Sequence, residues 1–330
     1  MTVQLIIIII IAALVLAASV FAVATPYPAV YFVRWLFTRY PYVPPADYDR
    51  YLENVTIQRD IDYGSSYPSG LLDIIKPKNF TGGEKVIFAV HGGAYVSEGS
   101  KTEFYYVMLA SEGFVTVNVK YAIAPEQAKY PVPVKQLEEA YTFIKNHNDS
   151  YKLNLDKVLF SGDSAGGQIA GQFVALQTNP GYIETMNSLS PIQFRQVLPL
   201  ESMDGVVLLC AIYDFLQLEP PPKNTMKLPL KKLGMAYFNS SNVHSKIIAG
   251  AGILDKVTGN FPRTFITDAN TYSFEFEAKE MIDILASKNI PVTGIFYDAS
   301  EVVLYHNYQF HLDTPQGLQT WQKLLEFLKQ

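Results

Sequence analysis

A serine on a sharp turn between a strand and a helix is the feature that most restricts the fold of this 330-residue chain. The apolar run Val158–Phe160 stops at Gly162-Asp-Ser-Ala-Gly166, and a helix-like run to about Gln177 follows. This is the pattern G-x-S-x-G, in which glycines let strand and helix pack closely around a strained turn. The pattern predicts Ser164 at the apex of a strand–turn–helix unit, with its hydroxyl pointing outward.

Strand-like and helix-like segments alternate along the rest of the chain. Apolar runs at 86–90, 114–119, 206–212, 264–267 and 292–297 predict strands, and spacing at 134–146, 274–287 and 314–329 predicts helices. Such alternation is typical of an α/β protein with a mostly parallel central sheet covered by helices on both faces. Two earlier runs, Val55–Tyr63 and Leu71–Ile75, predict an antiparallel pair.

The N-terminal run Leu5–Ala24 is uncharged and apolar. About 20 such residues in a helix cover a ~30 Å hydrocarbon core, so we expect a single-pass membrane anchor in contact with the lipid bilayer through residues 5–24. The competing hypothesis is a cleaved signal peptide with an A-x-A site at Ala22–Ala24, but Met1–Gln4 carries no basic residue. Arg34 and Arg39 follow the span and favour a cytoplasmic body, and the side of the membrane is left open.

Composition excludes several classes of function. With a formal charge of −5, an apolar half and no basic run, the chain predicts neither a disordered protein nor a nucleic-acid-binding surface. The single cysteine, Cys210, excludes a disulfide framework and a cysteine-rich metal site within one chain. We expect it to pack as a small core residue, and no metal is expected.

Ser164 needs a base to accept its proton and an acid to orient that base. In this architecture the acid and then the histidine follow the nucleophile along the chain. His306 lies in the loop after the last predicted strand and is the candidate base, while His311 is expected near the surface. Glycines after a buried strand let amides approach a developing oxyanion. Gly92 and Gly93, with the amide of Ala165, are therefore the predicted oxyanion hole.

Three spaced motifs carry a resemblance to a known family. They are His91-Gly-Gly, Tyr121-Ala-Ile-Ala-Pro-Glu126 with Tyr130-Pro131, and Gly162-Asp-Ser-Ala-Gly-Gly167. Together they resemble the hormone-sensitive-lipase-like branch of the α/β-hydrolase fold over roughly residues 85–330. The resemblance implies a carboxylester hydrolase that works through an acyl-enzyme without a cofactor. It also implies a lid built from the N-terminal segment and an insertion before the acid strand.

The resulting division of the chain has three parts. Residues 1–25 are the anchor or signal peptide, residues 26–54 a juxtamembrane or lid segment, and residues 55–330 the α/β-hydrolase domain with a lid insertion at about 215–250.

The chain departs from the family pattern at two places. Ala94 stands at the fourth position of the His-Gly-Gly-Gly motif, where alanine still presents an N–H. In Thr267-Asp-Ala-Asn-Thr-Tyr272, Thr271 occupies the usual position of the acid and Asp268 that of a glycine. Asp268 is the nearest carboxylate and our candidate acid. Glu275, Glu277 or no acid at all are the alternatives.

The sequence thus predicts a membrane-anchored serine carboxylesterase for small to medium acyl or lipid-like esters, with Ser164 as nucleophile. Two other functions stay open. One is a non-catalytic receptor for a small molecule on the same fold, and the other is an amidase or peptidase.

Overall fold

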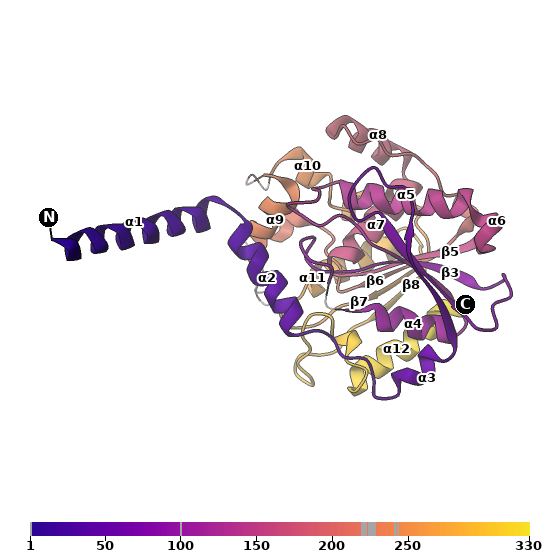
Figure 1. The fold of residues 1–330 in the computed structure, drawn as a ribbon. Coiled ribbons are helices and arrows are strands. Elements are labelled where there is room, and N and C mark those ends of the chain that lie inside the picture. The colour runs from indigo at the N-terminus through magenta and orange to yellow at the C-terminus, as the bar shows by residue number, and fades with distance from the viewer. Residues whose placement is uncertain (1, 100, 219–222, 224–228, 241, 243) are drawn as a thin grey trace.

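An eight-stranded sheet runs through the centre of the protein, in the order β1-β2-β4-β3-β5-β6-β7-β8 (Figure 1). The computed structural model describes residues 2–99, 101–218, 223, 229–240, 242 and 244–330. β2 pairs antiparallel with β1 and with β4, and every other neighbouring pair is parallel. The strands are β1 Val55–Asp62, β2 Leu71–Pro77, β3 Lys85–Val90, β4 Val115–Val119, β5 Asn154–Asp163, β6 Met203–Leu209, β7 Thr264–Thr267 and β8 Val292–Ile295.

Helices cover both faces of this sheet. The helices α5 (Val132–Asn146), α7 (Ala165–Thr178) and α11 (Glu275–Ser287) share one hydrophobic core with side chains such as Phe88 and Phe160. On the opposite face, α3 (Tyr48–Leu52), α4 (Glu103–Ser111) and α12 (Pro315–Leu328) share a second core with strand residues such as Ile87. The division follows from the alternation of side chains along each strand.

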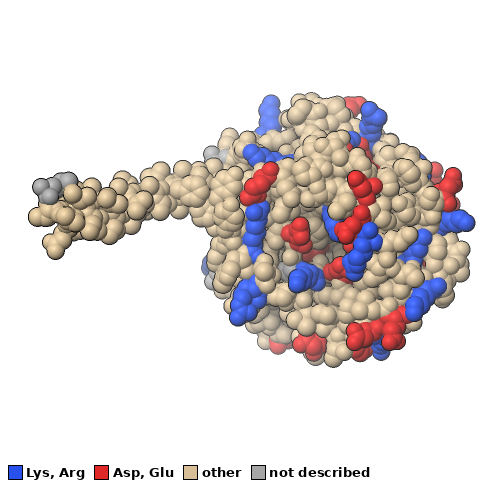
Figure 2. All heavy atoms as spheres, viewed as in Figure 1, with Lys and Arg blue, Asp and Glu red and all other residues tan. Residues whose placement is uncertain are grey.

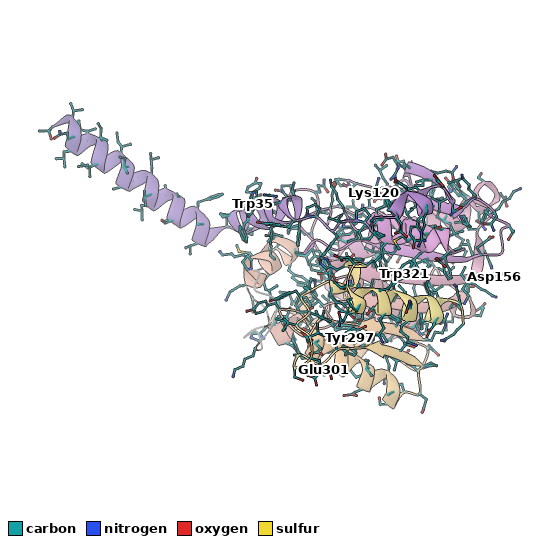
Figure 3. All side chains as sticks on the ribbon, turned by 90° about the horizontal axis from the view of Figure 1, so that it is seen from below. Trp35, Lys120, Asp156, Tyr297, Glu301 and Trp321 are labelled. Atoms are coloured by element: carbon teal, nitrogen blue, oxygen red, sulfur yellow. The ribbon has the colours of Figure 1, made fainter. Side chains whose placement is uncertain are left out.

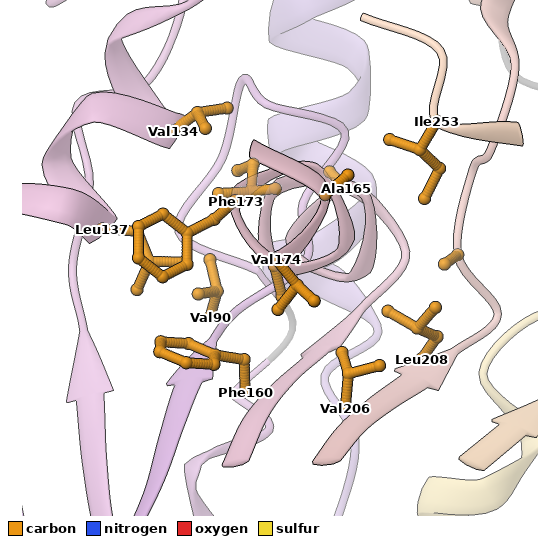
Figure 4. Close-up of a cluster of buried hydrophobic side chains, with 14 of the residues drawn as sticks. Val90, Val134, Leu137, Phe160, Ala165, Phe173, Val174, Val206, Leu208 and Ile253 are labelled. Atoms are coloured by element: carbon orange, nitrogen blue, oxygen red, sulfur yellow. The ribbon is translucent and has the colours of Figure 1, made fainter. Parts of the chain in front are cut away.

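The helix after the candidate nucleophile is buried all round. Every residue of α7 is buried, and Figure 4 shows it among apolar side chains from the strands and from α5, with Phe173 and Val174 pointing to Phe160 and Val206. A helix enclosed in this way cannot shift without opening the core. It therefore fixes the turn at its N-terminus.

Two differences from the sequence-based expectation concern chain segments near the site. The strand expected to reach Ile212 ends at Leu209, because Cys210 has a φ of 48° and turns the chain out of the sheet. The segment before β1 contains α2 (Tyr27–Arg39), a helix that the aromatic and proline-rich sequence did not indicate. Part of the expected lid insertion, residues 219–222 and 224–228, lies outside the described residues; α9 (Leu230–Phe238) and α10 (Lys246–Ala249) follow it.

The N-terminal helix α1 (Val3–Ala24) projects away from the body and buries none of its residues (Figure 1). It is the one helix among the described residues that is long and apolar enough to cross a membrane by length and composition. Figure 2 shows no charged side chain along it, whereas both signs of charge are scattered over the body. α2 follows after two residues and packs on α9 through the buried side chains Val30 and Val33. The remaining helices, α6 (Asn148–Tyr151) and α8 (Pro180–Leu189), lie at the ends of α5 and α7.

Candidate active site

Ser164 occupies the strained turn that the sequence predicts. It has φ 52° and ψ −119°, between the last residue of β5 and the first residue of α7. The turn is possible because the residues two positions before and after Ser164 are glycines: a Cβ on Gly162 would lie 2.3 Å from the backbone of Gly166, and one on Gly166 would lie 2.1 Å from the carbonyl oxygen of Val90. The Ser164 amide donates to the carbonyl of Leu209 at 2.8 Å. These contacts hold the serine at the N-terminus of a buried helix, where the helix dipole favours negative charge.

The carboxylate of Asp163 joins three loops of the site. Its Oδ1 accepts a hydrogen bond from the Gly92 amide at 3.0 Å, and its Oδ2 accepts one from Nδ2 of Asn307 at 2.9 Å. Burial raises the pKa of Asp163 to about 6, while both hydrogen bonds act in the opposite direction. A Cβ on Gly92 would lie 2.3 Å from Asp163 Oδ2, so only glycine fits there.

This contact bears on the predicted oxyanion hole. The Gly92 amide points to Asp163 and is already used, whereas Ala94 lines the same cavity as Ser164. Gly93 has a φ of 119°, and a Cβ there would lie 2.2 Å from the carbonyl oxygen of Ser97, so the backbone can turn here only at a glycine. The Gly92 amide is therefore engaged by Asp163, and Ala94 and Tyr95 are the residues of this loop that border the cavity.

The Tyr121 motif supports this loop by packing against His91, the residue before Gly92. The rings of His91 and Tyr121 stack at 4.3 Å, and the Tyr121 hydroxyl donates to the His91 carbonyl at 3.1 Å. Burial lowers the pKa of His91, so its ring is neutral at pH 7. His91 is a packing residue under the loop.

The histidine expected as base lies beside the candidate acid, with a serine between them. The Ser273 hydroxyl donates a short hydrogen bond to Asp268 Oδ1. The hydroxyl oxygen of Ser273 also lies 2.7 Å from Nδ1 of His306. The Asp268 Oδ1 also accepts from the Ala269 amide at 2.7 Å. Within the described residues, Nε2 of His306 and Oδ2 of Asp268 are buried without a hydrogen-bond partner.

Burial shifts the pKa of both groups toward their neutral forms. It lowers the pKa of His306 to about 3, which leaves the imidazole neutral and able to accept a proton at pH 7. It raises the pKa of Asp268 to about 7, although the hydrogen bond from Ser273 favours the carboxylate. An acid and a base with displaced pKa values are common at catalytic sites.

The other carboxylates that the sequence left open have different partners. Glu277 is buried and its Oε2 accepts the amides of Tyr213 at 2.6 Å and Asp214 at 2.8 Å, so it fastens the loop after β6. Glu275 pairs with Lys279 at 2.9 Å. At the usual acid position, the Thr271 amide donates to the carbonyl of Leu304. Asp268 is the candidate that the structure brings close to His306.

An apolar cavity of about 50 Å³ opens beside Ser164. Phe274 links this cavity to the base, because it lines the cavity and its ring meets the His306 ring edge-on at 5.5 Å. The loop after β3, the loop after β6 and helix α9 supply the remaining walls. Their lining residues are Ala94, Tyr95, Ile212, Phe215, Leu218, Leu230, Leu233, Gly234 and Tyr237. Ser164 itself is 8% exposed.

Cys210 lies in the site as well as in the core. Ligand atoms of Cys210, Asp268 and His306 are all within 4.8 Å of one another, a spacing that a metal ion can bridge. Metal binding requires a thiolate, and burial raises the pKa of the Cys210 thiol well above its usual value. The Cys210 sulfur instead accepts the Asn307 amide at 3.3 Å and donates to Gln309 at 3.4 Å. We assign the three groups to a hydrogen-bonded network.

Sequence reasoning missed two residues of this site. Ser273 stands just before α11, where a serine is expected to cap a helix rather than to contact a histidine. Asn307 has a φ of 64°, a backbone conformation that asparagine tolerates. Its position directly after His306 was the one available signal. The histidine that was set aside, His311, is exposed and contacts the ring of Tyr42.

One family model and several curated proteins match parts of this chain. A family model described as BD-FAE matches residues 72–269. The acetyl esterase of Salmonella schwarzengrund is 28% identical over 89 residues, which are 26% of this chain and 27% of that protein. The chain thus aligns with about a quarter of the length of that relative.

Solved structures resemble the whole chain at low identity. Esterase B from Lactobacillus rhamnosis matches with a TM-score of 0.70 and 17% identity, over 92% of this chain and 95% of that one. The thermostable carboxylesterase EstE1 from a metagenomic library matches with a TM-score of 0.66 and 18% identity, over 93% and 98% of the two chains. Likeness at this level shows a shared fold. It confirms the α/β-hydrolase fold expected from the motifs.

Proposed function

The chain belongs to the BD-FAE family, and from that premise we propose that it is a membrane-anchored serine hydrolase that cleaves carboxylic esters of short acyl groups. The observation that carries the proposal is the placement of Ser164. It stands on a strained turn at the N-terminus of α7 and lines an apolar cavity, of which Phe274, the neighbour of the neutral His306 ring, is another wall. The names of the curated and structural relatives support an ester as the substrate.

In the first half of the reaction, Oγ of Ser164 attacks the ester carbonyl and Nε2 of His306 takes the serine proton. The tetrahedral intermediate then expels the alcohol, which receives that proton, and an acyl-enzyme remains. In the second half, water attacks the acyl group, again giving its proton to Nε2, and the acid leaves as Oγ regains the proton. Asp268 stabilises the positive charge that His306 carries in both halves.

We assign the oxyanion hole to the amides of Gly93, Ala94 and Ala165. This assignment moves the site one residue along the chain from the predicted pair Gly92 and Gly93, because Asp163 accepts the Gly92 amide. The loss of one such donor costs about 3–4 kcal/mol of transition-state stabilisation.

The size of the cavity limits the acyl group. About 50 Å³ accommodates on the order of three to four non-hydrogen atoms. The carbon chains of acetyl to butyryl groups match this volume. We therefore narrow the substrate class from small or medium acyl esters to short ones.

The anchor is the second part of the proposal. An apolar 22-residue helix that buries none of its residues is unfavourable in water and favourable in a bilayer. The exposed rings of Tyr31, Phe32 and Trp35 on α2 continue this apolar surface at the level where aromatic side chains meet headgroups. Phe37, in contrast, packs against the hydrophobic core and is not part of this exposed apolar surface.

A fluorophosphonate probe tests the catalytic part directly, since it reacts with activated serines. The detergent-solubilised wild-type protein should be labelled and should hydrolyse p-nitrophenyl acetate, and Ser164→Ala should do neither. Equal labelling of Ser164→Ala would overturn the proposal.

The same assay separates the two alternative functions. Binding of p-nitrophenyl acetate without turnover would favour the small-molecule receptor. Faster cleavage of the matched anilide than of the ester would favour the amidase or peptidase.

A further inference from the structure

We infer that Ser273 is a positioning residue of the site, a neutral hydroxyl through which Asp268 acts on His306. The inference rests on the proposed function and adds a fourth member to the Ser164, His306 and Asp268 set. The Ser273 side chain is 3% exposed and touches both groups, through a short hydrogen bond to Asp268 Oδ1 and a distance of 2.7 Å to His306 Nδ1.

The single hydrogen of the Ser273 hydroxyl determines which atom is the donor in its contact with His306. A hydroxyl has one hydrogen, and when Asp268 is ionised the hydrogen of Ser273 is donated to its carboxylate. The Ser273 oxygen can therefore only accept from His306, so Nδ1 of the ring carries the hydrogen. That tautomer leaves the lone pair on Nε2, which is unpartnered and is the atom that must take the Ser164 proton.

The same contact transmits charge. When His306 becomes an imidazolium, its Nδ1–H donates more strongly to the Ser273 oxygen. The hydroxyl in turn donates more strongly to Asp268, because hydrogen bonds in a chain polarise one another. Ser273 keeps its proton throughout, and no bond is formed or broken on it.

Other groups around the ring do not replace this contact. The Cys210 thiol is held by Gln309 and Asn307. The Tyr42 hydroxyl donates to the backbone carbonyl of His306 at 3.4 Å rather than to its ring. Ser273 is the residue for which a hydrogen bond to the His306 ring is observed among the described side chains.

The test uses the full-length protein in detergent with p-nitrophenyl acetate. Ser273→Ala removes the hydroxyl and Ser273→Thr keeps it. As a control, Ser287→Ala removes an exposed serine hydroxyl at the end of α11, the helix that follows Ser273. We expect Ser273→Ala to lower kcat by roughly 10- to 100-fold with KM nearly unchanged, because the variant keeps the general base, worth about 10²–10⁴-fold in all, and loses only part of its orientation. Ser273→Thr should recover most of the loss, and Ser287→Ala should match the wild type.

A double-mutant cycle separates a relay from a packing effect. If Asp268 acts through Ser273, Asp268→Asn should lower kcat in the wild type but have little further effect in Ser273→Ala. Full additivity of the two losses, or an unchanged kcat in Ser273→Ala, would overturn the inference. If Ser273→Ala does not fold, as judged by circular dichroism, Ser273→Thr decides: a kcat as low as that of Asp268→Asn would contradict a role for the hydroxyl.

Failure of this inference differs from failure of the proposed function. An inactive, unlabelled wild type would refute both. An active wild type whose kcat is indifferent to Ser273 would refute only the relay.

Discussion

Asn307 donates a hydrogen bond through Nδ2 to Oδ2 of Asp163, at 2.9 Å, across 144 positions of the sequence. Asp163 precedes the candidate nucleophile and Asn307 follows the candidate base, so this bond sets how the two loops of the candidate site lie relative to each other. Both partners are buried, which makes the bond costly to break.

We predict that replacing Asn307 destabilises the protein and lowers its activity. Asn307→Gly removes the hydrogen bond but accepts the φ of 64°, and should reduce the free energy of unfolding by about 1–3 kcal/mol. Asn307→Ala adds backbone strain and should be about 1 kcal/mol less stable than Asn307→Gly. Denaturant unfolding in detergent measures both values. Equal stability of Asn307→Gly and the wild type would show that the bond contributes nothing.

The pH dependence of activity should follow Asp268. Only the ionised carboxylate stabilises the imidazolium, and the pKa of Asp268 is raised by burial to about 7. Because an acid ionises as pH rises through its pKa, kcat/KM for p-nitrophenyl acetate should increase through about pH 7. The pKa of His306, lowered to about 3 by burial, leaves this histidine neutral over the same range.

The variant Asp268→Asn tests this assignment. It should be roughly 100-fold less active at pH 8, less than the ~10⁴-fold loss seen where carboxylate and imidazole touch directly, and its pH profile should be flat near 7. Persistence of the same pH dependence in Asp268→Asn would assign the titration to another group.

Gly234 should control the acyl length that the cavity accepts. It lies in α9, lines the cavity, and a Cβ there would meet no atom within 4 Å. Gly234→Leu should fill this space and lower kcat/KM for p-nitrophenyl butyrate about 10-fold or more relative to the acetate ester. Gly181→Leu, at an exposed position near the start of α8, is the matched control. An unchanged butyrate-to-acetate ratio in Gly234→Leu would place the acyl group elsewhere.

The two tryptophans of the chain allow a direct test of the anchor. Trp35 on α2 is 56% exposed, whereas Trp321 on α12 is 5% exposed inside the body (Figure 3). In vesicles that contain brominated phosphatidylcholine, fluorescence should be quenched in the wild type and not in Trp35→Phe, which reports Trp321 alone. Quenching that is identical in the two proteins would contradict contact between α2 and the bilayer.

The sequence allowed much of this structure to be predicted, for local reasons. A nucleophile turn needs small residues within a few positions, so the glycines around Ser164 reveal it, and buried parallel strands appear as uninterrupted apolar runs. The use of the Gly92 amide by Asp163 could not be seen, because the partners are 71 positions apart. Ser273 was missed for a similar reason: a hydroxyl near the start of a helix has the same sequence signature whether it caps the helix or contacts a distant imidazole.

The α2 helix escaped prediction because its stability comes from its contacts rather than from its own sequence. It buries only Val30 and Val33 and leaves several aromatic rings outside. Helices of this kind are held by tertiary packing, which a sequence pattern does not reveal.

Arg34 fastens α2 to the hydrolase body. Its guanidinium donates to the carbonyl of Val96 at 2.6 Å and of Ala124 at 3.1 Å, and forms a two-pronged ion pair with Glu126. Val96 belongs to the loop that follows the proposed oxyanion amides, so the helix nearest the apolar span also braces a loop of the candidate site. A soluble form of the protein should therefore be cut at Thr25 or Pro26, between α1 and α2. A cut after Tyr40 would remove α2, and with it the contacts of Arg34 to the body, as well as the apolar helix α1.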